Sequence, residues 1–252
     1  MTANIELKTR HQFARLIEKR ERWNSLKYSS AAQERFERLV GIHWATQNCA
    51  LDEISDPDLW KKEVLDEARA KHLECHMAAS HAMLRFSREK EYVSAEDLME
   101  IDRIMLGGVS PSAGKYRQLE VQSLGEGHEP AEAELVPLLV ENALDWSRSG
   151  GFNEMHEVEK AALMLIKLID IQPFDKGNGR TLRLFSNFFL LKAGYPPAII
   201  DPCKGSQYAM AIQNSLRFHT QPLIDLLAES VHQSLFYCLD EPTPAPGLTV
   251  LQ

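Results

Sequence analysis

Between two long apolar stretches lies a short polar turn with the sequence QPFDKGNGRTLR, residues 172–183. Gly177 and Gly179 have no Cβ atom, so backbone N–H groups beside them can approach a ligand closely. The turn opens a helix, whose first N–H groups are unpaired and whose dipole is positive at that end. Arg180 adds a planar guanidinium suited to phosphate oxygens, and Arg183 lies on the same helix face one turn later. These residues predict a phosphate-binding turn. The alternative is that the glycines cap helices and the arginines are solvated.

The stretches on either side of the turn are expected to be buried helices. Residues 158–171 are mostly apolar, and the residues that follow Asn178 are apolar over a wide arc of a helix. A polar turn between two buried helices indicates either a functional site or very tight packing.

Apolar residues recur with helical spacing along nearly the whole chain. Predicted helices cover residues 10–24, 31–50, 58–87, 94–106, 131–148, 154–170, 178–193, 205–217 and 221–238. One segment differs, because a glycine-rich loop at 107–114 precedes residues 116–124, where apolar and polar residues alternate as in a strand or hairpin. The sequence therefore predicts an all-α fold with one small β-hairpin.

Composition limits the classes of function. The chain has 252 residues and a formal net charge of −8, and this acidic charge argues against broad nucleic-acid binding. Its apolar stretches are too short for a membrane span. The four cysteines are scattered, and the N-terminal residues lack the apolar core of a signal peptide. We therefore expect reduced thiols in a cytoplasmic protein.

The turn resembles the signature of the Fic (Fido) family, which has the form HPFx[D/E]GNGRxxR. The matching residues are Pro173, Phe174, Gly177, Asn178, Gly179, Arg180 and Arg183. Residues 114–124, which begin Gly114-Lys115-Tyr116-Arg117, resemble the family's flap, a hairpin that holds a target segment by strand addition. We call residues 114–124 the flap segment.

The resemblance covers residues 35–230 and implies the helical Fic fold. On this basis we expect N-terminal helices at residues 1–57, a Fic core at 58–238 and a Pro-rich tail at 239–252.

The resemblance also implies an activity. Most members transfer AMP from ATP to a hydroxyl of a protein target. The motif histidine acts as the base, the acidic residue holds Mg²⁺, and the glycine-rich turn binds the phosphates. The implied partners are an ATP-like nucleotide, or another phosphate compound, and a protein segment bound at Lys115, Tyr116 and Arg117 of the flap segment.

Two motif positions depart from the family in ways that affect catalysis. Gln172 replaces the histidine, and a neutral amide cannot take a hydroxyl proton, although it can orient a group by hydrogen bonds. Lys176 replaces the metal-binding acid, and an ammonium cannot bind Mg²⁺ but can place its own charge on a phosphate. Asp175 lies one position earlier and is expected to be a solvated turn residue. The candidate catalytic residues are Gln172, Lys176 and Asp175, with no metal site expected.

A third departure concerns self-inhibition. Many members carry an inhibitory helix of the form [S/T]xxxE[G/N], whose glutamate pairs with the second motif arginine. Residues 43–48 are the candidate here, with Gln47 in place of the glutamate. An uncharged amide would hold Arg183 more weakly than a carboxylate. The alternative is that residues 43–48 are part of an ordinary amphipathic helix.

Three functional hypotheses remain. The first is a diverged Fic-type transferase that works without the usual base and metal ligand. The second is a catalytically silent Fic protein that binds a nucleotide or a partner as a regulator, and the third is a Fic fold reused for small-molecule chemistry. Neither a nucleic acid nor a membrane is an expected partner, and a homodimer is compatible with the sequence. His72 and His76 have metal-ligand spacing but no third ligand, and His156 is expected to be a cap or surface residue.

Overall fold

The computed structural model describes residues 2–26, 30–55, 65–125 and 128–240, so the predicted start of the core and most of the predicted tail lie outside it. Its α-helices are α1 (Thr2–Ser25), α2 (Ser30–Ser55), α3 (Leu65–Glu89), α4 (Ala95–Met105), α5 (Val136–Trp146), α6 (Gly150–Asn153), α7 (Glu157–Ile171), α8 (Asn178–Ser186), α9 (Phe188–Lys192), α10 (Gly205–Leu216) and α11 (Gln221–Asp240). Short 3-10 helices lie at Ala133–Leu135 and Pro202–Lys204. This architecture confirms the all-α prediction. Within the described ranges, no helix combines the length and apolar character needed to cross a bilayer.

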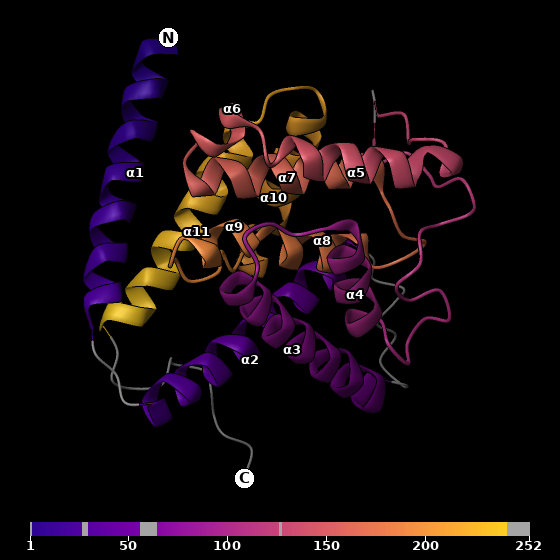
Figure 1. The fold of residues 1–252 in the computed structure, drawn as a ribbon, viewed down its shortest axis with the longest axis horizontal. Helices are drawn as coiled ribbons and strands as arrows, with labels where there is room; N and C mark the ends of the chain where they lie inside the picture. Colours follow the sequence, from indigo (N-terminus) through magenta and orange to yellow (C-terminus); the bar gives the residue numbers. More distant parts are fainter. Residues whose placement is uncertain (1, 27–29, 56–64, 126–127, 241–252) are drawn as a thin grey trace.

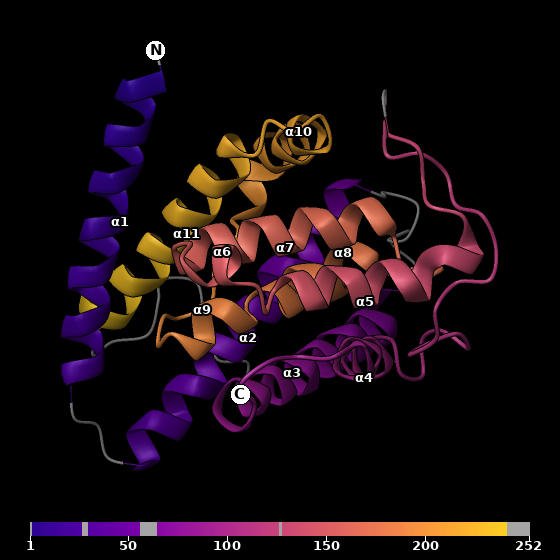
Figure 2. The ribbon, with the colours of Figure 1, turned by 45° about the horizontal axis from the view of Figure 1, so that its top comes forward.

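Helix α7 lies at the centre of the molecule (Figure 1). It contacts α5, α8, α9, α10 and α11, and its apolar side chains are almost completely buried, as in Ala162, Leu165 and Leu168. Helices α3 and α4 pack together on the side away from α10 (Figure 2), and α1 lies at the edge of the molecule against α11. The polar turn after α7 thus begins at the end of a deeply buried helix.

Several helix ends are set by local chemistry that the sequence shows. Ser94 and Asp97 form the expected capping box at the start of α4. Gly194 has a φ of +79° after the end of α9, and Tyr195 N donates to Leu190 O in a Schellman arrangement. His156 caps α7 by accepting a hydrogen bond from Val158 N, which confirms its expected role as a cap.

Two of the differences between the predicted and the observed helices have a clear local cause. Pro137 lies in the first turn of α5, which therefore begins after a 3-10 turn instead of at residue 131. The predicted helix at 178–193 is divided into α8 and α9 at Asn187. Asn187 Nδ2 donates to Arg183 O at 2.8 Å, and its Oδ1 accepts from Ala198 N at 2.7 Å. This side chain competes with the helical backbone and breaks the helix.

The prediction of a strand or hairpin in the flap segment is wrong, because the segment forms no strand-to-strand hydrogen bonds. No strand occurs among the described residues, and 116–124 has no partner strand. Leu119 is 75% exposed, whereas Arg117 is fully buried. The buried residue is therefore the charged one, because its guanidinium has carbonyl groups to bind.

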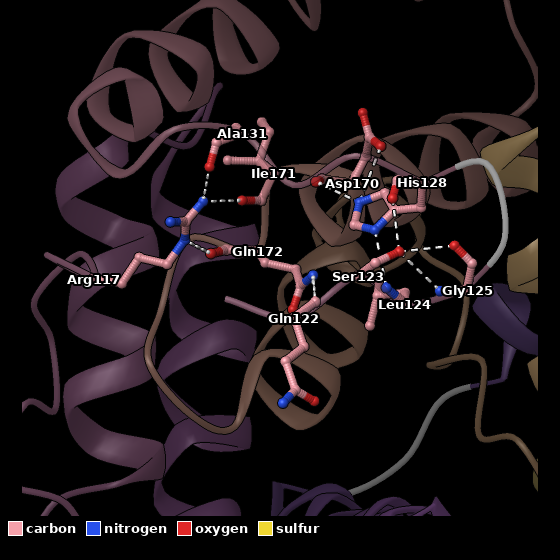
Figure 3. A network of polar contacts seen from close by, with 10 residues as sticks. All are labelled: Arg117, Gln122, Ser123, Leu124, Gly125, His128, Ala131, Asp170, Ile171 and Gln172. Carbon is pink, nitrogen blue, oxygen red and sulfur yellow. Dashed lines mark hydrogen bonds and ion pairs between the residues drawn. The ribbon is translucent and has the colours of Figure 1, made fainter. Parts of the chain in front are cut away.

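Arg117 anchors the flap segment to the end of α7 (Figure 3). Its Nε donates to Gln172 O at 2.8 Å, and Nη2 donates to Ile171 O at 3.4 Å and to Ala131 O. Nη1 donates to Leu119 O at 3.0 Å, within the segment itself. One side chain thus joins the flap segment, the residues before α5 and the C-terminus of α7.

Arg117→Lys should destabilise the protein by about 2–4 kcal/mol, because one ammonium cannot satisfy carbonyl groups that lie on several sides. Arg148→Lys is the matched control, since Arg148 is an exposed partner of Asp145 and its replacement should cost less than about 0.5 kcal/mol. Urea unfolding measures both free energies. Equal losses in the two variants would contradict the anchoring role of Arg117.

Candidate functional site

Helix α7 ends in a residue with an unusual backbone conformation. Gln172 has a φ of 48° and a ψ of 67°, in the left-handed region that residues other than glycine adopt rarely. Its N–H donates to Leu168 O at 3.0 Å, and the residue is only 8% exposed. Such strain persists where the surroundings hold it, and it occurs often at functional sites. The position of the family's base is therefore sharply defined.

The turn between α7 and α8 is braced by its own side chains. Asn178 Oδ1 accepts from Phe174 N at 3.0 Å, and Nδ2 donates to Phe174 O at 2.7 Å. Gly177 has a φ of +75°, and a Cβ atom there would lie 2.8 Å from Leu106 Cδ1. Asn178 and Gly177 thus fix the turn, while Gly179 lies in the first turn of α8.

The tip of the turn is exposed and carries one residue of each charge. Asp175 and Lys176 are both exposed. Mg²⁺ binds several oxygen ligands, and this tip offers one carboxylate beside one ammonium, so the residues present do not fit the metal that the resemblance implies. Asp175 lies in an open pocket with a volume of about 360 Å³. The rest of that pocket is lined by Gln118, Leu119, Glu120 and Val121 of the flap segment.

Both motif arginines are held inside the molecule. Arg180 is 6% exposed, and its Nη1 lies 2.9 Å from His72 Nδ1 on α3. Since arginine can only donate, this His72 nitrogen is the acceptor. Arg183 is 7% exposed, its Nη2 donates to Asn48 O at 3.1 Å, and its guanidinium lies over the Tyr208 ring. Helices α2, α3 and α10 therefore fix the directions of the two guanidinium groups.

The side chain from α2 that reaches Arg183 is Asn48, one position after the predicted Gln47. Asn48 Oδ1 accepts from Arg183 Nε. Asn48 Nδ2 donates to Arg180 O at 3.2 Å and lies 2.6 Å from His76 Nε2. Adjacent residues of a helix point about 100° apart, and Gln47 is half-buried on a neighbouring face. Helix α2 thus contacts the motif arginine through Asn48, whereas the prediction placed this contact at Gln47.

His76 is held in its neutral form by this network. Its Nε2 faces the amide donor of Asn48 and must accept, so Nδ1 carries the proton and faces Ser80 Oγ at 3.2 Å. Ser80 Oγ in turn donates to His76 O at 2.9 Å. Burial, followed by the charges of Arg183 and Arg180, lowers the pKa of His76 from 6.5 to about 3. His72 therefore contacts Arg180, and His76 contacts the Asn48 side chain that binds Arg183. The sequence predicts neither contact.

The three residues predicted to bind a target at the flap lie in different environments. Lys115 is exposed, and Tyr116 is half-buried with its ring 6.0 Å from that of Phe174. Arg117 is fully buried and makes the internal contacts described above, so its guanidinium cannot contact a target in this conformation. The prediction for Arg117 was wrong because the sequence does not show which residue donates to the carbonyl groups at the end of α7.

The side-chain amide of Gln172 has a defined orientation. Its Nε2 donates to Gln122 O at 3.2 Å (Figure 3). Only the NH₂ end of an amide can face a carbonyl oxygen, so the assignment of N and O is fixed by chemistry. Gln172 Oε1 accepts no hydrogen bond from the residues that the structure describes. The group at the position of the family's base is therefore a fixed hydrogen-bond acceptor.

His128 holds the other end of the flap segment, a role that no pattern in the sequence predicts. Its Nδ1 accepts from Leu124 N at 3.0 Å, so Nε2 carries the proton and donates to Asp170 O at 3.1 Å (Figure 3). Ser123 Oγ lies 2.6 Å from His128 O. The segment is therefore attached to α7 at both ends, by Arg117 and by His128.

Comparison with known proteins agrees with this geometry. Residues 92–190, which run from just before α4 into α9, match the model of the Fic/DOC family. The family model thus detects a Fic/DOC domain in this part of the chain. The motif and the flap segment both lie within residues 92–190, whereas Asn48, His72 and His76 precede them.

The relatives give this assignment more detail. The chain is 35% identical over 148 residues to "Protein adenylyltransferase Fic" of Drosophila mojavensis, covering 58% of this chain and 29% of that protein. It is 26% identical over 242 residues to the protein of the same name from Aedes aegypti, covering 92% and 48% of the two chains. This chain thus spans less than half of the length of these curated relatives. The structure of Fic-1 from C. elegans has a TM-score of 0.76 at 21% identity, covering 95% of this chain and 74% of that one. That likeness shows a shared fold.

Stability should fall as the pH is lowered from about 6.5 toward 3, in part through His76. The folded protein holds His76 neutral over this range while the unfolded chain takes up a proton, so the stabilisation is complete above the unfolded pKa and is lost toward the folded pKa. His76→Gln keeps an acceptor for Asn48 but does not titrate. Near pH 5 the free energy of unfolding of this variant should depend on pH less steeply than that of the native chain, by about 1.4 kcal/mol per pH unit. Equal slopes in denaturant titrations from pH 4 to 7 would show that His76 is not held neutral.

Proposed function

We propose that this protein is a Fic-type nucleotidyltransferase in which Gln172 orients the acceptor hydroxyl instead of removing its proton. An ATP-like nucleotide binds through its phosphates at the turn, and a protein segment with a hydroxyl group binds along the flap segment. The hydroxyl oxygen attacks the α-phosphorus, the bond to pyrophosphate breaks, and the hydroxyl proton passes to solvent water. The reaction is slower than with a histidine base, because no side chain at position 172 removes the proton.

The orientation of the Gln172 amide carries this proposal. Since Nε2 is committed to Gln122 O, Oε1 is the atom that can accept a hydrogen bond from a hydroxyl group. The amide is also held by the left-handed backbone of its own residue. A glutamine that had only replaced a lost catalytic residue would need neither the hydrogen bond to Gln122 nor the left-handed backbone. An acceptor held in one place lowers the entropy cost of aligning the nucleophile.

Phosphate binding is supported by the first turn of α8. Gly177 and Gly179 leave the backbone N–H groups open to an anion at the positive end of the helix. Arg180 comes from the same turn, with its guanidinium held toward α3 by His72. Lys176 adds a further positive charge one residue before Gly177, in place of a metal ion. We therefore expect nucleotide binding to depend little on Mg²⁺.

A protein target is supported by the pocket between the flap segment and Asp175. Residues 118–121 belong to no helix or strand there, and Leu119 is 75% exposed. An extended target segment can bind such a backbone through its main chain and place a side chain at the turn. The relatives named protein adenylyltransferase are consistent with this class of substrate.

A catalytically silent nucleotide-binding regulator is the second candidate. Its supporting observation is that Arg183 is held by both the side chain and the backbone of Asn48. In this conformation a nucleotide could bind at Arg180 without reaching the second arginine in a productive pose. Activity measurements separate the two candidates.

Arg180→Ala should weaken binding of ATP by about tenfold or more, because it removes a charge-assisted contact to phosphate. Arg148→Ala, which removes an exposed arginine outside the motif, is the matched control and should bind ATP like the native protein. Isothermal titration calorimetry with and without a chelator of Mg²⁺ measures both. No binding of ATP, of other nucleotides or of inorganic phosphate by the native protein would overturn the phosphate site, and a large loss on chelation would overturn the role of Lys176.

Gln172→His should raise AMP transfer from labelled ATP by about 10² to 10⁴ if the acceptor and nucleotide are already aligned, since that is the range expected for a general base. The double variant Gln172→His/Lys176→Asp also restores the family's metal ligand and should respond to Mg²⁺. Gln172→Leu is the matched control, because it fills similar space without an acceptor and should lose native activity. If the native chain and the Gln172→Leu variant label targets equally, Gln172 has no orienting role. If neither the native chain nor the double variant labels any target, the regulator hypothesis replaces the transferase.

A further inference from the structure

The C-terminal part of α4 supports both the start of the flap segment and the start of the motif turn. Gly114 has a φ of +75°, and a Cβ atom there would lie 2.6 Å from Arg103 Cβ. A Cβ atom at Gly177 would lie 2.8 Å from Leu106 Cδ1, one helical turn further along. The two glycines therefore pack closely against neighbouring positions of one helix end, where a side chain would not fit.

A buried carboxyl group joins these two glycine-containing segments. Asp102 is 1% exposed, and its Oδ2 accepts from Gly114 N at 2.8 Å. Its Oδ1 accepts from Thr181 Oγ1 at 3.0 Å, within the first turn of α8, and Thr181 is completely buried. Asp102 thus holds the first residue of the flap segment against α8, the helix that begins at the phosphate-binding turn.

The charges around Asp102 belong to the same turn. Burial raises the pKa of Asp102 from 3.8 to about 6, and the charge of Asp175 adds to this rise. The hydrogen bonds from Gly114 and Thr181, together with the charge of Arg180 on α8, act in the opposite direction. From α3, His72 faces the same guanidinium of Arg180. An anion at the turn would share the charge of Arg180 and would therefore oppose ionisation of Asp102.

We propose that Asp102 is a positioning residue that couples anion binding at the turn to the order of the flap segment, and that it takes up a proton from solvent when a doubly charged anion binds. This inference rests on the proposed phosphate site. The neutral carboxyl group can still accept from Gly114 N through one oxygen while its O–H donates to Thr181 Oγ1. Both contacts therefore survive protonation, so the flap segment stays attached when the anion is present.

The chain offers two variants that separate charge from hydrogen bonding. Asp102→Asn imitates the neutral carboxyl group, since its carbonyl can accept from Gly114 N and its NH₂ can donate to Thr181 Oγ1. Asp102→Ala removes both contacts. Sulfate is a suitable probe because it stays doubly charged from pH 5 to 8, unlike phosphate or a nucleotide. Its affinity is measured from the backbone amide NMR shifts of residues 177–180.

In the native protein the affinity for sulfate should rise by roughly threefold or more between pH 7.5 and pH 5.5, since each pKa unit gained by Asp102 on binding is worth a factor of ten. Asp102→Asn should bind sulfate more tightly than the native protein at pH 7.5 and lose most of this pH dependence. Any contribution of His72 to the pH dependence of sulfate affinity is present in both proteins and cancels in the comparison.

Hydrogen exchange of residues 114–124 tests the coupling itself. Sulfate should slow exchange in the native protein and in Asp102→Asn, whereas Asp102→Ala should exchange faster and respond to sulfate less. Two results would overturn this inference and leave the phosphate site intact. In the first, sulfate binds and Asp102→Asn keeps the native pH dependence of the affinity. In the second, hydrogen exchange of the flap segment is the same in Asp102→Ala as in the native protein. If Asp102→Ala does not fold, the pH comparison with Asp102→Asn decides alone. No sulfate binding to the native protein at any pH would overturn both the inference and the phosphate site.

Discussion

The buried C-terminus of α7 imposes the constraint on which the site depends. A helix end leaves carbonyl groups without intrahelical partners, and inside a protein each needs a donor. Here Asp170 O, Ile171 O and Gln172 O accept from His128 or Arg117, and Pro173 O accepts from Arg117 N. All of these donors come from the flap segment or the residues just after it. Satisfying the helix end therefore places the flap segment beside the motif turn.

The same constraint explains why the flap segment forms no strand. The segment donates hydrogen bonds to a helix terminus instead of to another strand, and the central contact is the guanidinium of Arg117, which has several donors. Because Arg117 is used in this way, the outer edge of residues 118–121 remains open beside the pocket that Asp175 completes. A segment that is firmly attached on one side and open on the other suits the binding of an extended target.

Part of this arrangement could be predicted from the sequence, because it depends on local chemistry. The capping box at Ser94 and the helix stop at Gly194 need only neighbouring residues, and the motif fixes its own turn through Asn178 and Phe174. The contacts that hold the arginines could not be predicted in the same way. They join residues more than a hundred positions apart, such as Asn48 with Arg183 and His72 with Arg180. A helical pattern shows which face is apolar, but a one-residue error in register changes which side chain meets a guanidinium.

The proposed function requires a phosphate compound to bind at the first turn of α8 while the Gln172 amide points its oxygen at the acceptor hydroxyl. A crystal structure with a non-hydrolysable ATP analogue, with and without Mg²⁺, tests this most directly. We predict phosphate oxygens within hydrogen-bond distance of Arg180 and of the backbone N–H groups after Gly177. Gln172 Nε2 should still donate to Gln122 O, with Oε1 facing the α-phosphate. Phosphates bound elsewhere, or a Gln172 amide turned away from the nucleotide, would contradict it.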